Sequence, residues 1–236
     1  MRVETAAKQF SEYQQEALPA VHENEWVEDC EESIARRIAF FKWAEQEGLT
    51  TDPNFEFVEG GREHLIFESP SRGEFLKATI PPILGYYVDV DEYPPRLFPN
   101  QNPVEYLQRF IAMEEIWGFQ SELIAVVGDS SKYTIIIRQN LIVGEAASLT
   151  EIREHMTSLK FAELNISLGY TKSLSFFNEN FAIFDLRPAN VVKMNEGVVI
   201  PIDCFVSRLK PEQVESLKNL QTHLHGVAGS NPVAPT

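Results

Sequence analysis

Two short apolar runs toward the end of the sequence are each followed by polar residues at fixed positions. The polar residues are Asp185, Arg187 and Asn190 after the run at 181–184, and Asp203 after the run at 198–202. Apolar runs of this length, bounded by polar residues and proline, are typical of buried strands. The segment is therefore expected to form two strands whose ends carry two carboxylates, a guanidinium and an amide, facing a cleft.

The composition of the 236 residues bounds the class of protein. Hydrophobic residues make up 44% of the chain, which is enough for one two-lobed domain or two small ones. The formal charge of −15 argues against binding to nucleic acid or an anionic membrane, because both need a basic protein face. The two cysteines, Cys30 and Cys204, show no metal-ligand spacing, so we expect a reducing, cytoplasmic location. No apolar run reaches the roughly 18 residues of a membrane span.

The hydrophobic period changes along the chain and predicts both helices and strands. Ile34, Ile38 and Phe41 recur at helical intervals, so residues 5–48 are expected to be helical and to stop at Gly48. The expected strands are 55–58, 64–67, 75–79, 124–127 and 133–137. The other expected helices are 103–117, 150–159 with Thr150 as N-cap, and 210–220. The proline-rich stretch 81–102 is expected to be a long loop, and the tail 226–236 to be disordered.

The order of these elements predicts a two-lobed module. The expected segments are a helical leader at 1–50, an antiparallel sheet with one helix at 51–145, a reduced second lobe at 146–222, and a disordered tail at 223–236. A nucleotide is expected between the two lobes. The acidic leader has three open roles: a lid, a brace for the small lobe, or a docking element.

The polar residues at 185–203 suit phosphoryl transfer as a set. The Asp185 carboxylate can orient or deprotonate an attacking hydroxyl, and the Arg187 guanidinium can neutralise a phosphoryl group. Asn190 and Asp203 offer the hard oxygen ligands that Mg²⁺ prefers. Each residue alone also has an ordinary interpretation as a turn residue or a surface ion pair. Their joint spacing favours the functional interpretation.

A lysine upstream fits the same chemistry. Lys77 lies inside an apolar strand, where an unpaired lysine is rare, and it could bind the α- and β-phosphates of a nucleotide. The alternative is an edge-strand lysine whose amine reaches solvent. Its expected partner is Glu115 in the helix at 103–117, with Glu114 in reserve because a helix phase inferred from sequence can slip by one position.

The strand at 133–137 leads into a polar link that resembles a hinge. In a nucleotide site the backbone between Gln139 and Leu141 would hydrogen-bond adenine, and Glu145 would lie near the ribose. A plain strand-to-loop transition is the equally open alternative.

These residues together resemble a known family. Asp185-Leu-Arg-Pro-Ala-Asn190 resembles the catalytic loop of protein-kinase-like enzymes, commonly Asp-Leu-Lys-Pro-Glu-Asn, and Asp203 resembles the metal-binding Asp of their Asp-Phe-Gly motif. Within that superfamily the chain is most similar to the small kinase-like domain of phage and mobile-element polyvalent proteins. That likeness spans residues 30–210 and rests on Gly60-Gly61, the Lys77 strand, the helix end at 113–118 and Pro201-Ile202-Asp203.

The resemblance implies a two-lobed, protein-kinase-like α+β fold with a helical N-terminal leader and a minimal C-terminal lobe. It implies a phosphotransferase that uses ATP and Mg²⁺, with Asp185 as catalytic base. Asn190 and Asp203 would be the metal ligands, and Lys77 with Glu115 would hold the phosphates. The acceptor, a protein or a small molecule, is not indicated.

Several departures from the family pattern keep other functions open. The sequence has no Gly-x-Gly-x-x-Gly loop and no Ala-Pro-Glu segment, Phe184 precedes the candidate base, and Cys204-Phe205 follows Asp203. One alternative is a pseudokinase-like module that binds a nucleotide or a protein partner. Another is nucleotidyl transfer on the same scaffold.

Overall fold

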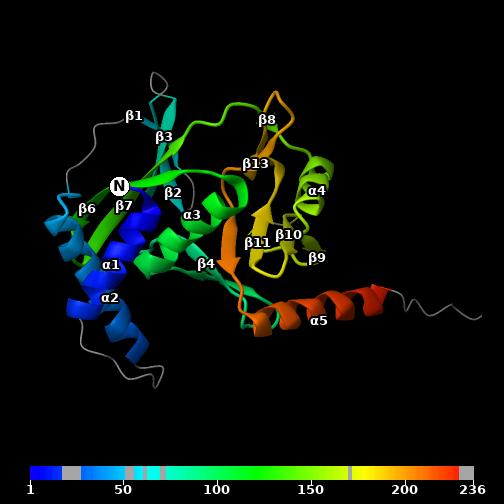
Figure 1. Ribbon diagram of the computed structural model, residues 1–236, viewed down its shortest axis with the longest axis horizontal. Helices are drawn as coiled ribbons and strands as arrows, with labels where there is room; N and C mark the ends of the chain where they lie inside the picture. The colour runs from blue at the N-terminus through cyan, green and yellow to red at the C-terminus, as the bar shows by residue number, and fades with distance from the viewer. Residues whose placement is uncertain (18–27, 51–55, 61–62, 70–72, 170–171, 229–236) are drawn as a thin grey trace, which may run out of the picture. The chain divides into compact units, whose positions relative to one another are not determined.

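The computed structural model describes residues 1–17, 28–50, 56–60, 63–69, 73–169 and 172–228 (Figure 1). Within these ranges the chain combines five helices with several antiparallel sheets, as the changing hydrophobic period predicts. Contacts divide it into two compact units. The first unit comprises Met1–Tyr87 and Phe98–Leu141, and the second comprises Val88–Leu97 and Ile142–Thr236.

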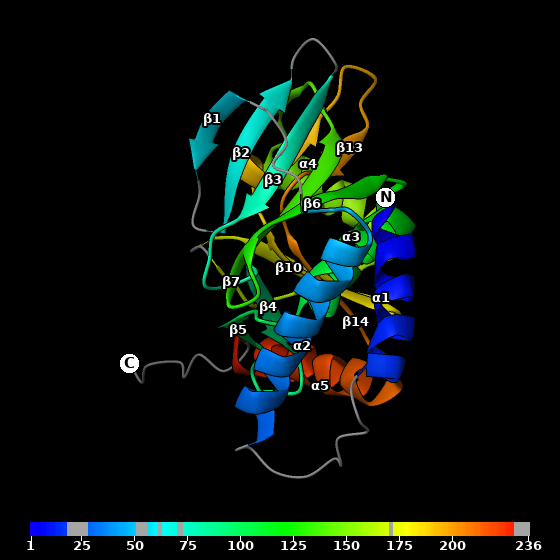
Figure 2. The ribbon, with the colours of Figure 1, turned by 90° about the vertical axis from the view of Figure 1, so that its left-hand side faces the viewer.

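The first unit is built from three helices and a five-stranded sheet. The helices are α1 (Val3–Ala17), α2 (Glu28–Gln46) and α3 (Pro103–Trp117). The strands are β1 (Glu56–Gly60), β2 (His64–Ser69), β3 (Glu74–Thr79), β6 (Ser121–Asp129) and β7 (Lys132–Asn140). They pair in the order β1-β2-β3-β7-β6, every pair antiparallel, with β1 to β3 forming a meander (Figure 2).

The two N-terminal helices belong to this unit and pack against its sheet. Figure 2 shows α1 and α2 side by side, and their buried aromatic side chains meet. The Phe10 ring on α1 lies 4.9 Å from that of Phe40 and 5.8 Å from that of Trp43 on α2. Phe40 in turn contacts Tyr133 of β7, centroid to centroid at 6.0 Å. The two helices therefore pack on the sheet of the first unit, whereas Ile34, one of the residues at helical intervals, is 53% exposed.

Helix α3 has the bounds that its sequence predicts, because its signals are local. The Asn102 side chain accepts from the Val104 N–H at 3.0 Å, and Pro103 occupies the first turn, where a missing N–H costs nothing. At the other end Gly118 adopts a left-handed conformation (φ 75°) and its N–H closes the helix on Glu114.

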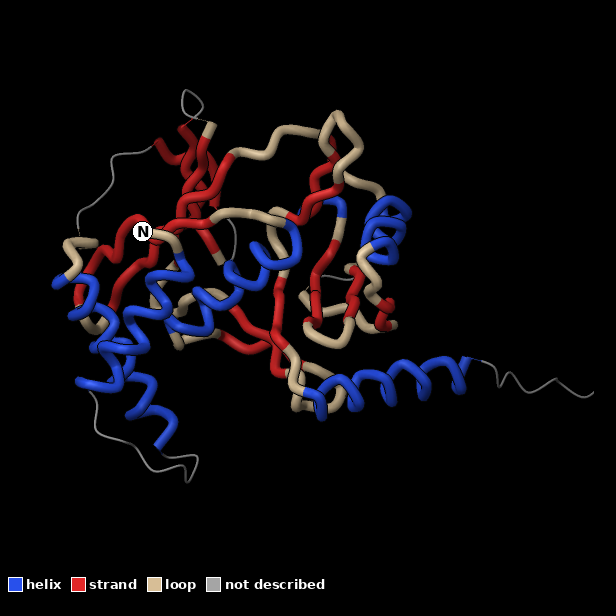
Figure 3. The backbone as a smooth tube through the Cα atoms, in the orientation of Figure 1, coloured by secondary structure: helices blue, strands red, loops and turns tan. Residues whose placement is uncertain are grey.

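The second unit is built from short strands and two helices, which Figure 3 traces in red and blue. The strands are β8 (Glu145–Ala146), β9 (Ala162–Leu164), β10 (Leu174–Phe177), β11 (Phe181–Leu186), β12 (Val191–Lys193), β13 (Val199–Pro201) and β14 (Phe205–Arg208). They form one sheet in the order β14-β11-β10-β9 and another in the order β13-β12-β8. The two helices are α4 (Leu149–Ser158) and α5 (Pro211–Ala228), and a 3-10 turn, η2 (Pro188–Asn190), lies between β11 and β12.

Strand β11 is central to its sheet and buried over its whole length. Its side chains from Phe181 to Leu186 are all buried, which is why its sequence is a continuous apolar run rather than an alternating one. From the end of β11 the polar motif at 185–190 continues through η2 into β12. The two predicted strands are present as β11 and β13, but they do not pair with each other: β11 pairs with β10 and β14, and β13 pairs with β12, a strand that the sequence did not predict.

Three expectations at element boundaries need correction. The stretch 81–102 is not a continuous loop, because it contains β4 (Tyr86–Asp89) paired with β5 (Arg96–Pro99). The N-cap of α4 is Ser148 and not Thr150, because Ser148 accepts from the Glu151 N–H while Glu151 reaches back to the cap. Helix α5 runs to Ala228, past the expected end at 220, and the rest of the predicted tail lies outside the described residues.

No helix in the described ranges combines the length and the apolar character needed to cross a bilayer.

Candidate functional site

The candidate base lies in a strained position at the end of the buried central strand. Asp185 is the penultimate residue of β11 and is only 5% exposed. Its φ angle is +61°, a left-handed conformation that is uncommon for a residue with a side chain and costs of order 1–3 kcal/mol. Such strain persists only where the surroundings enforce it, and it is often found at functional sites.

The side chain of Asn190 holds Asp185 in place. Its amide nitrogen donates to the backbone carbonyl of Asp185 at 3.0 Å and to the Asp185 carboxylate oxygen Oδ2 at 3.0 Å. Both partners are acceptors, so the amide must present its NH₂ group to them. This fixes the orientation of Asn190 and directs its carbonyl oxygen Oδ1 away from Asp185. The η2 turn brings the two residues together, since the Asn190 N–H also donates to the Arg187 carbonyl.

Asp203 is tied to the same residue through the backbone. The carbonyl oxygen of Asn190 accepts from the N–H of Ile202 at 2.8 Å and from the N–H of Asp203 at 3.3 Å. The antiparallel pairing of β12 with β13 ends next to these bonds, at Val191 opposite Pro201. Hydrogen bonds thus link Asn190 to Asp185 through its side chain and to Asp203 through the backbone, and a shared functional site of the three residues stays a prediction.

Arg187 completes the cluster on the side of the carboxylate. Its Nε lies 3.5 Å from Asp185 Oδ2, and its side chain is 27% exposed. Its guanidinium is placed where it could meet an anionic ligand beside the carboxylate.

Gly169 is a site residue that the sequence does not reveal. Its backbone has φ +85°, and a Cβ added there would lie 2.9 Å from Cγ of Asp185 and 3.0 Å from Oδ1. The loop between β9 and β10 thus lies directly against the candidate base. A lone glycine in a polar loop carries no local signal of such a contact, because the partner comes from another strand of the sheet.

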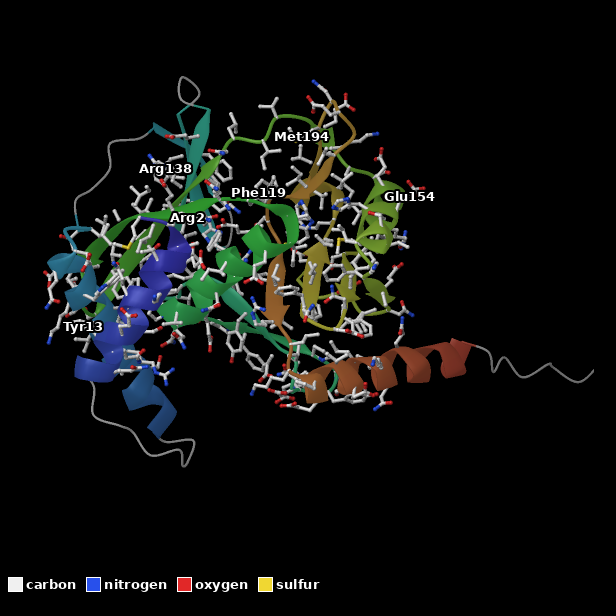
Figure 4. All side chains as sticks on the ribbon, in the orientation of Figure 1. Arg2, Tyr13, Phe119, Arg138, Glu154 and Met194 are labelled. Carbon is white, nitrogen blue, oxygen red and sulfur yellow. The ribbon has the colours of Figure 1, made fainter. Side chains whose placement is uncertain are left out.

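The first unit carries the predicted lysine. Lys77 is 4% exposed in the middle of β3, with its amine 5.8 Å from the centroid of the Phe75 ring. Glu115, its expected partner, is exposed on α3. Glu114, the reserve, accepts instead from the guanidinium of Arg2, the residue before α1, which Figure 4 labels. The lysine–glutamate pair therefore stays a prediction.

The predicted hinge residues are part of β7 and its immediate extension. The Gln139 side chain is buried and donates to Ser121 Oγ at 2.8 Å. The Leu141 N–H donates to the Gly73 carbonyl at 2.7 Å, so a bond from this N–H to adenine would have to replace that one. Glu145 lies exposed on β8, opposite Lys193 of β12.

The cluster in the second unit presents a buried, oriented carboxylate, a nearby guanidinium, and two oxygen-bearing side chains on adjoining strand ends. These groups suit the activation of a hydroxyl beside a bound cation. Comparisons of the chain with family models, with curated proteins and with solved structures found no match.

Proposed function

We propose that this chain is a kinase-like phosphotransferase that uses ATP and Mg²⁺. The observation that carries the proposal is the double hydrogen bond from Asn190 to Asp185, because it orients a buried carboxylate and leaves the Asn190 carbonyl oxygen directed elsewhere. A turn residue or a surface ion pair needs neither burial nor this second bond. The resemblance of residues 185–190 to a kinase catalytic loop adds the reaction class.

Asp185 would act as the general base. A carboxylate at this position can accept the proton of the attacking hydroxyl as the phosphoryl group is transferred. Its backbone strain and its bonds to Asn190 keep the carboxylate in one orientation, so little of the barrier is spent on reorganising it. Arg187, at 3.5 Å, would stabilise negative charge on the transferred group.

Asn190 and Asp203 would hold the cation. An amide oxygen and a carboxylate are both hard donors, and the backbone bonds between the two residues fix their spacing. When bound, Mg²⁺ would supply charge neutralisation for the nucleotide phosphates. Lys77 would bind the α- and β-phosphates, as the resemblance implies.

A nucleotide-binding or protein-interaction module without turnover is the second candidate. One observation favours a module that binds a protein rather than a nucleotide: in the expected hinge between Gln139 and Leu141, the Leu141 N–H already donates to the Gly73 carbonyl. The missing glycine-rich loop points the same way.

Intact-mass spectrometry after incubation with Mg·ATP separates these functions. A gain of about 80 Da on the chain or on an added acceptor supports phosphoryl transfer, whereas about 329 Da indicates nucleotidyl transfer. A rise in the unfolding temperature with no change in mass indicates the binding module. No thermal shift and no mass change would contradict both the phosphotransferase and the nucleotide-binding module, and would leave the protein-interaction module.

Three variants test the assigned roles. Asp203→Ala should abolish Mg²⁺-dependent nucleotide binding, whereas Asp185→Ala should keep binding and lose turnover. Glu179→Gln is the matched control, because Glu179 is an exposed carboxylate in the turn between β10 and β11 of the same unit. If Asp203→Ala bound Mg·ATP as tightly as the parent, the metal assignment would be wrong.

A further inference from the structure

The loop between β9 and β10 makes a close contact that the resemblance does not assign. The virtual Cβ of Gly169 lies 2.9 Å from Cγ, 3.0 Å from Oδ1 and 3.2 Å from Oδ2 of Asp185, so the whole carboxylate faces the glycine backbone. Asn190 binds Oδ2 of the same carboxylate. The carboxylate of Asp185 thus lies between the amide of Asn190, which donates to it, and the backbone of Gly169.

We propose that Gly169 is a positioning residue for Asp185, and this inference rests on the proposed function of Asp185 as the base. The absence of a side chain at position 169 permits the carboxylate orientation that Asn190 fixes. Any larger residue would push the carboxylate out of that orientation and misdirect it relative to the acceptor hydroxyl.

A Cβ at position 169 should displace the side chain of Asp185 rather than its backbone. Real Cβ atoms do not approach other heavy atoms to 2.9 Å, so an alanine here must displace its neighbour or the loop. Asp185 is buried, and both of its chain neighbours are held by strand pairing, Phe184 opposite Phe205 of β14 and Leu186 opposite Leu174 of β10. The side-chain torsion of Asp185 is the softest coordinate left, and rotating it breaks the bond from Asn190 Nδ2 to Oδ2.

Gly169 also has a positive φ angle that favours glycine, and the effect of this backbone conformation must be distinguished from the effect of the contact with Asp185. Its φ of +85° is disfavoured for any residue with a Cβ. Gly197, in the β12–β13 turn of the same unit, has a φ of +82° and nothing within 4 Å of its virtual Cβ. Gly197→Ala therefore reproduces the backbone strain of Gly169→Ala without the contact.

The test compares Gly169→Ala, Gly197→Ala and the parent chain by two measurements. The first is the side-chain amide signal of Asn190 in a ¹H–¹⁵N NMR spectrum, assigned with an Asn190 variant. Its chemical shift reports the hydrogen bond to Asp185 and needs no activity. The second is turnover with Mg·ATP, resolved into kcat and the KM for ATP.

We expect both alanine variants to lower the unfolding temperature and only Gly169→Ala to shift the Asn190 amide signal. Gly169→Ala should reduce kcat roughly a hundredfold with KM for ATP little changed, because misplacing a reacting group by about 1 Å costs that much. Equal Asn190 signals in the two variants would overturn the proposal, whatever the activity. A shifted Asn190 signal in a chain that shows no turnover even as the parent would sustain the positioning of Asp185 and reject the phosphotransferase assignment alone.

Discussion

The carboxylate of Glu63 accepts hydrogen bonds from the guanidinium of Arg109 on α3 and, at 3.0 Å, from the backbone N–H of Tyr86. Both charged side chains are buried, at 10% and 6% exposed. The glycine at position 85 has φ +85°, and a Cβ there would overlap Glu63 Oε1, so the backbone encloses the carboxylate. Glu63 therefore links the start of β2, the start of β4 and helix α3 within the first unit.

Breaking this pair should destabilise the chain strongly. Arg109→Leu leaves the Glu63 carboxylate buried with one partner lost, and such a change costs about 3–5 kcal/mol. Arg138→Ala is the control, because its pair with Glu122 is about one-third exposed and should be worth no more than about 1 kcal/mol. Urea unfolding of the two variants measures the difference. Equal losses would show that burial of the Glu63–Arg109 pair carries no special cost.

The leader helices should contribute to the core of the first unit as a brace. Phe10 is fully buried against Phe40 and Trp43, so Phe10→Ala should cost about 3–5 kcal/mol. Ile34→Ala, on an exposed part of α2, should change stability by less than about 0.5 kcal/mol. Thermal unfolding compares them. A leader that acts as a separate docking element would instead tolerate Phe10→Ala.

How much of the fold the sequence predicts depends on how local its signals are. Helix α3 follows from Asn102, Pro103 and Gly118, which act within a few residues of its ends. The strands β4 and β5 do not follow from local signals in this way. Two prolines, at 94 and 95, lie in the connection between them and Pro99 ends β5, so the stretch resembles a loop in sequence. Prolines there bound the hairpin rather than exclude it, and the pairing that makes it is not encoded locally.

The same distinction applies to the candidate site. The bond between Asp185 and Asn190 spans a single turn, so the spacing of the motif predicts that the two residues meet. The contact of Gly169 with Asp185 joins the β9–β10 loop to a different strand, and the positive φ of Asp185 accompanies that packing. Neither leaves a pattern in the neighbouring residues.

The N-cap of α4, which the structure places at Ser148 and not at Thr150, can be tested by substitution. Ser148→Ala removes the acceptor for the Glu151 N–H, at 3.2 Å, and should cost about 1 kcal/mol. Thr150→Ala, at the N-cap that the sequence suggested, should leave stability nearly unchanged. Urea unfolding of both variants decides, and a larger loss for Thr150→Ala would restore the sequence-based boundary.

The ion pair between Glu151 and Lys193 should make stability depend on pH in the acid range. The hydrogen bond from Lys193, with further ones from Ser148, lowers the pKa of Glu151 from 4.5 to about 2. Because the folded-state pKa lies below the unfolded one, this stabilisation is present above pH 4.5 and is lost as pH falls toward 2.

The measurement is the difference in unfolding temperature between the parent and Lys193→Met from pH 6 to pH 3. That difference should be largest above about pH 4.5 and should narrow as the carboxyl is protonated. Lys218→Met removes the same charge from an exposed pair on α5 and corrects for the change in net charge. A difference that stays constant over this range would contradict the assignment to Glu151.

The two hydrogen bonds from Asn190 should contribute clearly to the free energy of unfolding, because they satisfy a buried carboxylate. Asn190→Ala removes both donors from Asp185 and should cost about 1–3 kcal/mol. Asn190→Asp should be worse at neutral pH, since it places a second carboxylate about 3 Å from the first, where like charges oppose each other's ionisation. Asn195→Ala, exposed in the β12–β13 turn, is the control and should be neutral. Unfolding temperatures at pH 7 and pH 5 check this order. The unfolding temperature of Asn190→Asp should lie below that of Asn190→Ala at pH 7, and the difference should shrink at pH 5. A difference that grows at pH 5 would mean that repulsion between the two carboxylates is not its cause.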